Sequence, residues 1–501
     1  MNHAYRLVWS DLSASPVAVP ETAAGRGKSC GRRLARGLVG ASVAGALAWA
    51  AQAQNLSPTQ LPGQAQVSAG TVSMTRAANA LVVKQTSDKA VLNWNSFDIG
   101  RDASVSFVQP GASSTALNRV QGGMASQIEG RLSANGQVFL VNPSGIVFGR
   151  GAQVNVAGLV ASSLDWATED FLADRWRFTG TSTSGAVVNQ GSVQAEGGLI
   201  ALMAPRVSNS GSLQADGGQV VLAAGQKVAF KVSGSGLLQV TVDQGAVDAL
   251  VENKGLIQAD GGSVLLTAKG ANALLSGVVN NEGVVRAHTM QEREGRIVLL
   301  GDMDLGAVQV GGQLDASAPQ GGKGGFIETS AAQVFVAPNA RVNTLAAQGQ
   351  HGTWLIDPVD FNIATGGNIT GAQLGSQLEG GNITILNSSG STGTAGNVNV
   401  QEAVSWSAAT TLTLDAQGSV NLNADLSAAS GHLAINAATG GLSGSGGMSF
   451  GGSQQTVTVN QGGNSTYSGV ISGTGTSFSK TGAGTLTLSG ASSYSGGTTV
   501  T

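Results

Sequence analysis

The chain has 501 residues, 75 of them glycine, and 11% of its residues are charged, with a formal net charge of −3. An apolar fraction of 41% is too high, and this net charge too small, for a disordered chain. Aromatic residues make up only 4%, and basic residues cluster only within the first 53 positions, so neither an aromatic-rich core nor a nucleic-acid-binding surface is expected. The composition favours many short strands joined by tight corners.

The N-terminus has the three parts of a secretory signal. Residues 26–36 are rich in basic side chains, residues 38–51 are apolar, and Ala51-Gln52-Ala53 forms an A-x-A cleavage pattern. An apolar run of this length is too short to span a bilayer, so we predict a signal cleaved between Ala53 and Gln54, which implies the Sec translocon as a partner. No later apolar run reaches about 18 residues, and no transmembrane helix is predicted.

An apolar run in residues 136–149, GQVFLVNPSGIVFG, is interrupted in its middle. Pro143 cannot donate to a sheet ladder, so one continuous strand through it is not expected. Asparagine first, proline second and glycine fourth is the order that a type I turn favours. We therefore predict a strand over 138–141, a corner over 142–145 and a new strand over 146–148.

The middle of the chain repeats a unit of about twenty residues. The copies read NQGSVQAEGGLIAL, NSGSLQADGGQVVL and NKGLIQADGGSVLL, followed by a fainter NEGVVRA. Each copy opens on an asparagine, namely Asn189, Asn209, Asn253 and Asn281. An apolar residue follows at the fifth position of each copy, at Val193, Leu213, Ile257 and Val285. A Gly-Gly corner and a second alternating apolar pair complete the first three copies.

Alternation with a period of two places the paired apolar side chains on one face of a strand. Because the pattern returns each time in the same direction, the units should stack as coils, with the four asparagines aligned at one corner. We therefore predict an all-β chain, a right-handed parallel β-helix that follows the cleaved signal. The handedness is taken from the usual preference of parallel crossovers.

The sequence offers little for catalysis. After the signal, which contains the only cysteine, Cys30, the histidines are His288, His351 and His432, and they are widely spaced. No nucleophile elbow and no metalloprotease motif is present. Residues 302–304 are interpreted as a solvated turn and residues 291–294 as a surface loop. We expect no catalytic residue, no bound metal and no cofactor, and we do not expect an enzyme.

Three segments resemble parts of known exported proteins. Asn2, the run 5–9 and Gly27-Lys28 resemble the extended signal-peptide region of very large exported proteins of Gram-negative bacteria. Residues 92–165 are similar to the secretion domain of two-partner-secretion exoproteins, the filamentous haemagglutinin and high-molecular-weight adhesin group. Residues 468–500 resemble the autotransporter-associated β-strand repeat.

The resemblance to the secretion domain rests on one motif above all. Asn142-Pro143-Ser144-Gly145-Ile146 matches the family's Asn-Pro-Asn-Gly-Ile, with Ser144 where asparagine is usual. The family's other motif, Asn-Pro-Asn-Leu, is not present as such. Its neighbourhood is represented by residues 116–120, which makes Asn118 and Arg119 candidates for a second secretion motif.

The resemblance implies a protein secreted to the surface of a Gram-negative bacterium. A dedicated outer-membrane β-barrel transporter with POTRA domains would recognise the secretion domain in the periplasm, and the chain would fold outside. We divide the chain into a cleaved extended signal (1–53), a secretion domain (54–300), continuing β-helix (301–363), a Gly/Ser/Thr/Asn-rich stalk (364–460) and the autotransporter-associated repeat (461–501).

We expect a large adhesin that binds a host-cell or surface receptor, with this chain as the N-terminal part of a longer exoprotein. Three alternatives stay open: the stalk of a contact-dependent toxin-delivery protein, a cytolysin or haem-acquisition exoprotein, and an autotransporter passenger. The sequence encoded downstream tests the first, lysis and haem-binding assays test the second, and dependence of export on a separate transporter tests the third.

Overall fold

The computed structural model describes residues 5–10, 15–20, 56–232, 238–272, 277–387, 396–452 and 454–501. Its contacts divide the chain into two units, Met1–Asn55 and Leu56–Thr501. In the first unit, β1 (Tyr5–Ser10) pairs antiparallel with β2 (Ser15–Pro20). The predicted apolar run of the signal and the cleavage residues Ala51, Ala53 and Gln54 lie outside the described residues. None of the described helices has the length and apolarity that a bilayer-spanning segment needs.

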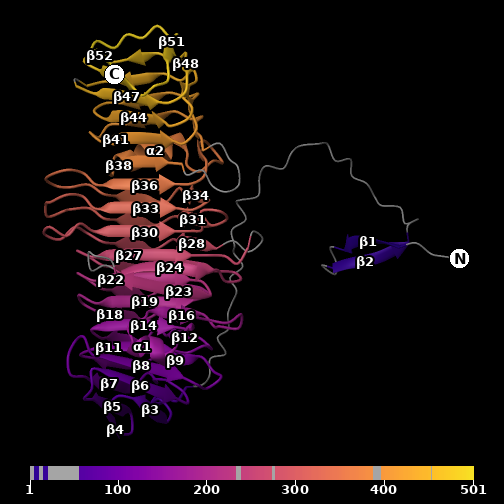
Figure 1. Cartoon of the computed structure of the whole chain (residues 1–501), viewed down its shortest axis with the longest axis vertical. Helices are drawn as coiled ribbons and strands as arrows, with labels where there is room; N and C mark the ends of the chain where they lie inside the picture. The colour runs from indigo at the N-terminus through magenta and orange to yellow at the C-terminus, as the bar shows by residue number, and fades with distance from the viewer. Residues whose placement is uncertain are drawn as a thin grey trace. The chain divides into compact units, whose positions relative to one another are not determined.

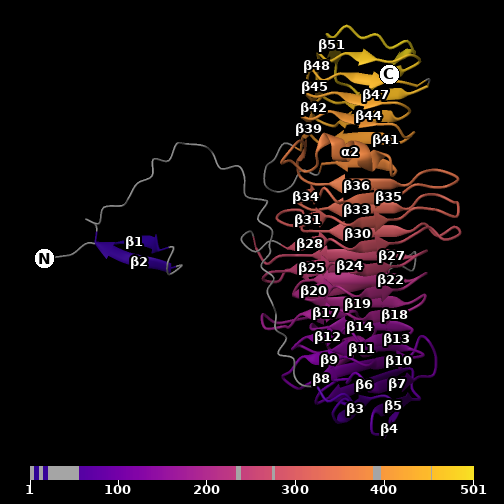
Figure 2. The same cartoon turned by 180° about the vertical axis from the view of Figure 1, so that it is seen from behind.

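The second unit is a parallel β-helix, which confirms the predicted fold (Figure 1). A complete coil passes through three sheets in a fixed order. For example, β11 (Gln137–Val141) lies in the first sheet, β12 (Ile146–Phe148) in the third and β13 (Gln153–Asn155) in the second, and β14 (Gly158–Ser162) returns to the first. Figure 2 shows the same stack of coils from behind, with α2 (Gly371–Leu378) between its upper and lower parts.

The first sheet follows the unit from end to end. Its strands are β3 (Ala65–Ala69), β6 (Lys89–Trp94), β8 (Thr115–Val120), β11 (Gln137–Val141), β14 (Gly158–Ser162), β19 (Leu199–Ala204), β22 (Gln219–Ala224), β27 (Ser263–Ala268), β30 (Arg296–Leu300), β33 (Phe326–Ser330), β36 (Thr353–Asp357), β38 (Asn382–Leu386), β41 (Thr411–Ala416), β44 (His432–Ala437), β47 (Thr456–Gln461), β50 (Ser477–Thr481) and β52 (Thr498–Val500).

The second and third sheets complete the coils of the N-terminal part. The second consists of β4 (Val72–Arg76), β5 (Ala80–Gln85), β7 (Ser104–Val108), β10 (Arg131–Ala134), β13 (Gln153–Asn155), β18 (Ser192–Gln194), β21 (Ser212–Gln214), β26 (Leu256–Gln258), β29 (Val284–Arg286), β32 (Gln313–Asp315) and β35 (Arg341–Asn343). The third consists of β9 (Ser126–Ile128), β12 (Ile146–Phe148), β17 (Val187–Asn189), β20 (Arg206–Asn209), β25 (Leu250–Asn253), β28 (Val278–Asn281), β31 (Ala307–Val310) and β34 (Gln333–Val336).

Shorter sheets take over these two sides in the C-terminal coils. One contains β37 (Phe361–Ile363), β39 (Val398–Val400), β42 (Val420–Leu422) and β45 (Leu442–Ser443). Another contains β40 (Val404–Trp406), β43 (Leu426–Ala428), β46 (Met448–Phe450) and β49 (Ile471–Ser472), and β48 (Ser465–Tyr467) pairs with β51 (Leu486–Leu488).

The predicted repeat supplies the core and one corner of the helix. Its apolar positions, Val193, Leu213, Ile257 and Val285, stand in register on β18, β21, β26 and β29 and are fully buried. The four asparagines are also fully buried and form a ladder. The Nδ2 of Asn189 donates to Oδ1 of Asn209, Asn209 donates to Asn253, and Asn253 donates to Asn281, each at 2.8 Å.

Within the coils themselves, two features depart from a simple parallel stack. At the N-terminal end, β3 pairs antiparallel with β6, and β4 pairs antiparallel with β5, before parallel pairing begins. Near the C-terminal part, α2 replaces a strand in one coil, and Thr370 and Gln373 form a capping box at its start. Neither feature is predicted by the repeat, because both interrupt it.

Candidate functional site

The turn at Asn142–Ile146 joins β11 to β12, as predicted. It closes through a hydrogen bond from the N–H of Gly145 to the carbonyl of Asn142, at 2.9 Å. The side chain of Asn142 is fully buried, and its Oδ1 accepts from the N–H of Ser144 at 3.0 Å. Its Nδ2 donates to the carbonyl of Met124 at 2.9 Å and to Oγ of Ser126 at 3.0 Å. Both polar atoms of the Asn142 side chain are thus used to hold the turn.

Gly145 fits the turn for a conformational reason. Its φ is +108°, in the region that side-chain-bearing residues rarely adopt, and a Cβ there would lie 2.7 Å from the carbonyl oxygen of Ala186. The N–H of Gly185 donates to the carbonyl of Pro143 at 2.8 Å, and the N–H of Ser126 donates to the carbonyl of Gly145 at 3.0 Å. The turn is therefore fixed from both neighbouring coils.

The outer side of the turn carries exposed apolar side chains, whereas its inner side is the buried, hydrogen-bonded frame formed by Asn142 and Gly145. Pro143 is exposed, and the side chain of the adjoining Met124 is 58% exposed. Ser144 contributes its backbone N–H to the bond with Asn142, so the presence of serine in place of the usual asparagine leaves that bond intact. The frame thus presents a small apolar surface at a fixed position.

A buried carboxyl group supports the strand next to the turn. The side chain of Asp98 is 8% exposed, and its Oδ1 accepts from the N–H of Gln127, on β9, at 2.9 Å. Burial raises the pKa of Asp98, and this effect outweighs the hydrogen bonds from Gln127 and Ser96. No sequence motif marks Asp98, so its burial was not predictable from the sequence.

The second candidate pair, Asn118 and Arg119, lies on β8, one coil before the turn. Asn118 points inward and is fully buried, its Oδ1 accepts from Nε1 of Trp94 at 2.9 Å, and its Nδ2 donates to the carbonyl of Phe139 at 3.3 Å. Arg119 points to the opposite face of the strand, where its Nε donates to Oδ1 of Asp165 at 2.9 Å. Asn118 therefore forms hydrogen bonds within the core, whereas Arg119 forms an ion pair outside it.

Arg119 anchors a segment that covers the outer face of the first sheet. Besides Asp165, it donates to Oγ1 of Thr168 at 3.1 Å and to the carbonyl of Trp166, which brings it to α1 (Thr168–Leu172) and β15 (Asp165–Trp166). The strands β15 (Asp165–Trp166), β16 (Arg177–Thr179), β23 (Lys227–Val232) and β24 (Leu238–Gln244) form a separate antiparallel sheet, the covering sheet.

A second apolar cluster lies between the covering sheet and the coils. Trp166, Phe178 and Phe230 from the covering sheet pack with Phe139, an outward residue of β11, and with outward residues of the neighbouring strands such as Val91, Leu117, Val160 and Val221. The ring centroids of Phe139 and Trp166 are 5.6 Å apart. The insertion of β23 and β24 also explains why 44 residues separate Asn209 from Asn253, whereas 20 separate Asn189 from Asn209.

The sequence carries a signal for this cluster. Runs such as QVFLV, GLVAS and QVVLAA are apolar at consecutive positions and not only at alternate ones. A strand that is apolar on both faces must be covered on both. The structure supplies the cover from segments that lie outside the repeat.

A cluster of acidic side chains and a histidine lies at a different corner, between the second sheet and the first. His288 lies between Oδ1 of Asp260, at 3.8 Å, and Oδ2 of Asp315, at 3.3 Å. Burial opposes ionisation of Asp315, but hydrogen bonds from Ser317 and the neighbouring His288 outweigh it and lower its pKa. Within the described ranges, no group of three His, Cys, Asp or Glu side chains is placed to hold a metal ion. At the predicted turn over residues 302–304, the N–H of Asp304 donates to Oδ1 of Asp302 at 2.8 Å.

Comparison with protein families gives three matches along the chain. The model of the TPS secretion domain matches residues 53–328. The model of the Extended Signal Peptide of Type V secretion system matches residues 1–50, and the Passenger-associated-transport-repeat matches residues 478–501.

Two curated relatives are similar to about half of the chain. Both are Heme/hemopexin-binding proteins of Haemophilus influenzae, 37% identical over 254 residues and 33% identical over 256 residues. The matches cover 49% and 46% of this chain, but only 28% and 27% of the relatives. The crystal structure of the HMW1 secretion domain from Haemophilus influenzae is similar at a TM-score of 0.56 and 21% identity, over 88% of this chain and 100% of that one. This last likeness shows the fold alone.

Proposed function

The chain belongs to the family defined by the TPS secretion domain and is a two-partner secreted exoprotein of a Gram-negative bacterium, and we propose that its transporter recognises the Asn142–Ile146 turn. Family membership implies an outer-membrane transporter as partner, and the extended signal peptide implies the Sec translocon. The observation that carries the proposal is the exposure of Pro143 on the turn and of Met124 beside it, while Asn142 and Gly145 are held by buried contacts. We propose that the POTRA domains of the transporter make this contact.

The test uses the full chain with its own signal, expressed with and without the gene of the partner transporter. The measured quantity is folded, protease-resistant exoprotein in the culture supernatant. We expect release only when the transporter is present. Release that is equal without the transporter would refute the partner, and an autotransporter mechanism would replace it.

Variants separate recognition of the turn from its folding. Pro143→Leu and Met124→Ala change exposed side chains and should reduce release, while the purified variants unfold at the temperature of the wild type. Met290→Ala is the matched control, because Met290 is 47% exposed and directly precedes the predicted surface loop 291–294 of another coil. Gly145→Val should block release by disrupting the turn itself. Normal release of all of these variants would remove the turn from the proposal.

For the exported protein we propose a binding role, as an adhesin with a receptor on host cells or other surfaces, and no enzymatic activity. The two curated relatives are binding proteins by name, which supports binding over catalysis. The test is adhesion of cells that display the exported chain, compared with cells that lack the transporter. Equal adhesion by both would contradict the adhesive role.

The names of these relatives favour a second candidate, haem or hemopexin capture. Haem iron needs an axial ligand, most often a histidine. In this chain the Nδ1 of His351 accepts from the N–H of Ala346 at 3.2 Å, and the Nδ1 of His432 accepts from the N–H of Thr456 at 3.2 Å. An imidazole whose Nδ1 accepts a hydrogen bond carries its proton on Nε2, so neither nitrogen of these two rings is free to ligate iron. Both ring nitrogens of His288 face carboxylates, those of Asp260 and Asp315. We therefore propose capture of the carrier protein rather than direct ligation of haem iron. Titration of the secreted chain with haem and with hemopexin distinguishes the two.

A further inference from the structure

The outer face of the first sheet changes its chemistry along the coils. In the N-terminal coils many of its outward side chains, such as Leu117, Phe139 and Val160, are apolar and buried beneath the covering sheet. From β41 onward almost all of the corresponding positions are polar and lie at the surface. They are Thr411, Thr413 and Asp415 on β41, His432 and Asn436 on β44, Thr456, Thr458 and Asn460 on β47, and Ser477, Ser479 and Thr481 on β50.

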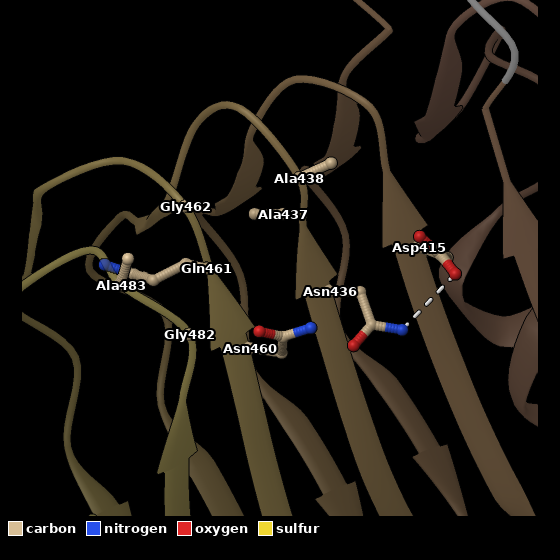
Figure 3. A pocket seen from close by; sticks show the side chains of 9 residues that line it. All are labelled: Asp415, Asn436, Ala437, Ala438, Asn460, Gln461, Gly462, Gly482 and Ala483. Atoms are coloured by element: carbon tan, nitrogen blue, oxygen red, sulfur yellow. Dashed lines mark hydrogen bonds between the residues drawn. The ribbon is translucent and has the colours of Figure 1, made fainter. Parts of the chain in front are cut away.

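One column of these side chains borders a groove that is open to solvent. Asp415, Asn436 and Asn460 stand in register on adjacent strands, about 4.8 Å apart as neighbouring strands are. The groove has a volume of about 280 Å³ and extends under the turns that follow the strands. Figure 3 shows the three side chains along one side and Gly462 and Gly482 at the turns.

The hydrogen-bonding capacity of this column is largely unused by the protein. Asn436 donates from Nδ2 to Oδ2 of Asp415 at 3.3 Å, and the carboxamide of Asn460 makes no hydrogen bond within the described part of the chain. In the ladder at the repeat corner, by contrast, Asn209 donates to Asn253 at 2.8 Å in the buried interior. The column therefore offers donors and acceptors that point to solvent at a fixed spacing.

Glycine keeps the groove open beside Asn460. Gly482 has a φ of +82°, and a Cβ there would lie 2.5 Å from Oδ1 of Asn460. A side chain at this position would therefore fill the space next to the carboxamide. The adjacent Lys480 is buried and donates its Nζ to the carbonyls of Thr481 and Gly482, at 2.6 and 3.0 Å. Lys480 therefore stabilises the turn from the buried side and is not among the residues that line the groove.

The chemistry of the groove selects a class of ligand. Among its described lining residues, Asp415 is the only one that carries a charge, so an acidic polymer meets no counter-charge there. A carboxylate and two carboxamides can each accept from, or donate to, neighbouring hydroxyl groups. Their regular spacing suits a chain whose hydroxyl groups also recur regularly. We propose that the groove at Asp415, Asn436 and Asn460 binds a neutral carbohydrate chain.

This inference rests on the proposed binding role and names a ligand class for it, but it is independent of the transporter contact. The groove lies beyond residues 53–328, which the secretion-domain model matches. The same cultures therefore provide two separate readouts. Loss of release measures the secretion turn, and loss of carbohydrate binding by a normally released chain measures the groove.

The experiment uses the full secreted chain on a surface that carries immobilised neutral oligosaccharides, with sialylated and sulfated ones beside them. Asn460→Ala and Asn436→Ala are compared with Asn155→Ala, which removes an exposed asparagine from the second sheet. We expect binding to neutral chains, weakened about ten-fold by each groove variant, as the loss of one or two hydrogen bonds predicts, and unchanged in Asn155→Ala.

Asp415→Asn tests the role of the carboxylate without changing its shape. It should weaken binding to neutral chains and not create binding to sulfated ones. Thermal unfolding of every variant at the wild-type temperature is the required control. Three outcomes would overturn the proposal: no binding to neutral oligosaccharides, binding to acidic ones only, or binding that is unchanged in Asn436→Ala and Asn460→Ala.

Discussion

Replacing Gly145 by alanine probes how strongly the secretion turn is held. At a φ of +108°, a residue with a side chain is strained by about 1–3 kcal/mol. The new Cβ would also lie 2.7 Å from the carbonyl oxygen of Ala186, which accepts a hydrogen bond from the N–H of Ile146 at 3.0 Å. Moving that carbonyl away costs about 1 kcal/mol more through the weakened bond. We therefore expect Gly145→Ala to destabilise the turn locally by about 2–4 kcal/mol.

Amide hydrogen exchange measures this loss where it occurs. A cost of about 2–4 kcal/mol corresponds to a fall in protection of about 30-fold to 1,000-fold for peptides that cover residues 137–148. Gly123→Ala is the matched control, because a Cβ at Gly123 meets nothing within 4 Å. If Gly145→Ala exchanged as slowly as the control, the turn would tolerate a side chain, and the argument from its backbone geometry would be wrong.

Three further variants test other contacts. Asn253→Ala breaks the buried ladder on both sides, leaving Asn209 without its acceptor and Asn281 without its donor, and should cost about 2–4 kcal/mol; thermal unfolding at the wild-type temperature would contradict this. Asp98 has a raised pKa, so the folded state binds its proton more tightly than the unfolded state, and stability is lost as the pH rises from the unfolded to the folded pKa. Asp98→Asn should remove that loss, so urea unfolding should show it to be more stable than the wild type at about pH 7 but not at about pH 3. If the stability difference between variant and wild type were the same at both pH values, this role of Asp98 would be ruled out. Arg119→Ala frees the segment at α1, so exchange over residues 165–172 should accelerate while the coils stay protected, and uniform protection would show that the cluster alone holds this segment.

The repeat made most of the parallel β-helix predictable. The asparagine and alternating apolar positions recur at a constant distance from each other within each copy, and stacking converts that regularity directly into buried columns and a ladder. The corner at Pro143 was predictable for a different reason. A turn is a local structure, so its residues carry the information that determines it.

The covering sheet was not predictable in the same way. Its strands β16 and β23 are separated by two coils, and their pairing depends on contacts that no local pattern records. Arg119 is an example, because its role follows from the distant Asp165 and Thr168 and not from its own neighbours in sequence. The short helix α2 was missed because it occupies the place of a strand, although the capping pair Thr370 and Gln373 is a usable local signal.

The outer face of the first sheet suggests why export and surface binding can evolve separately in one continuous fold. Near the turn, this face is apolar and covered, which fixes the coils that the transporter is proposed to contact. Farther along, the same face is polar and uncovered, so its side chains can change without disturbing the core. Trp166→Ala, within the covered part, should therefore reduce release and leave carbohydrate binding by the released fraction unchanged, whereas Asn460→Ala should do the reverse. Coupled loss of both properties in either variant would show that the two parts of the face are not independent.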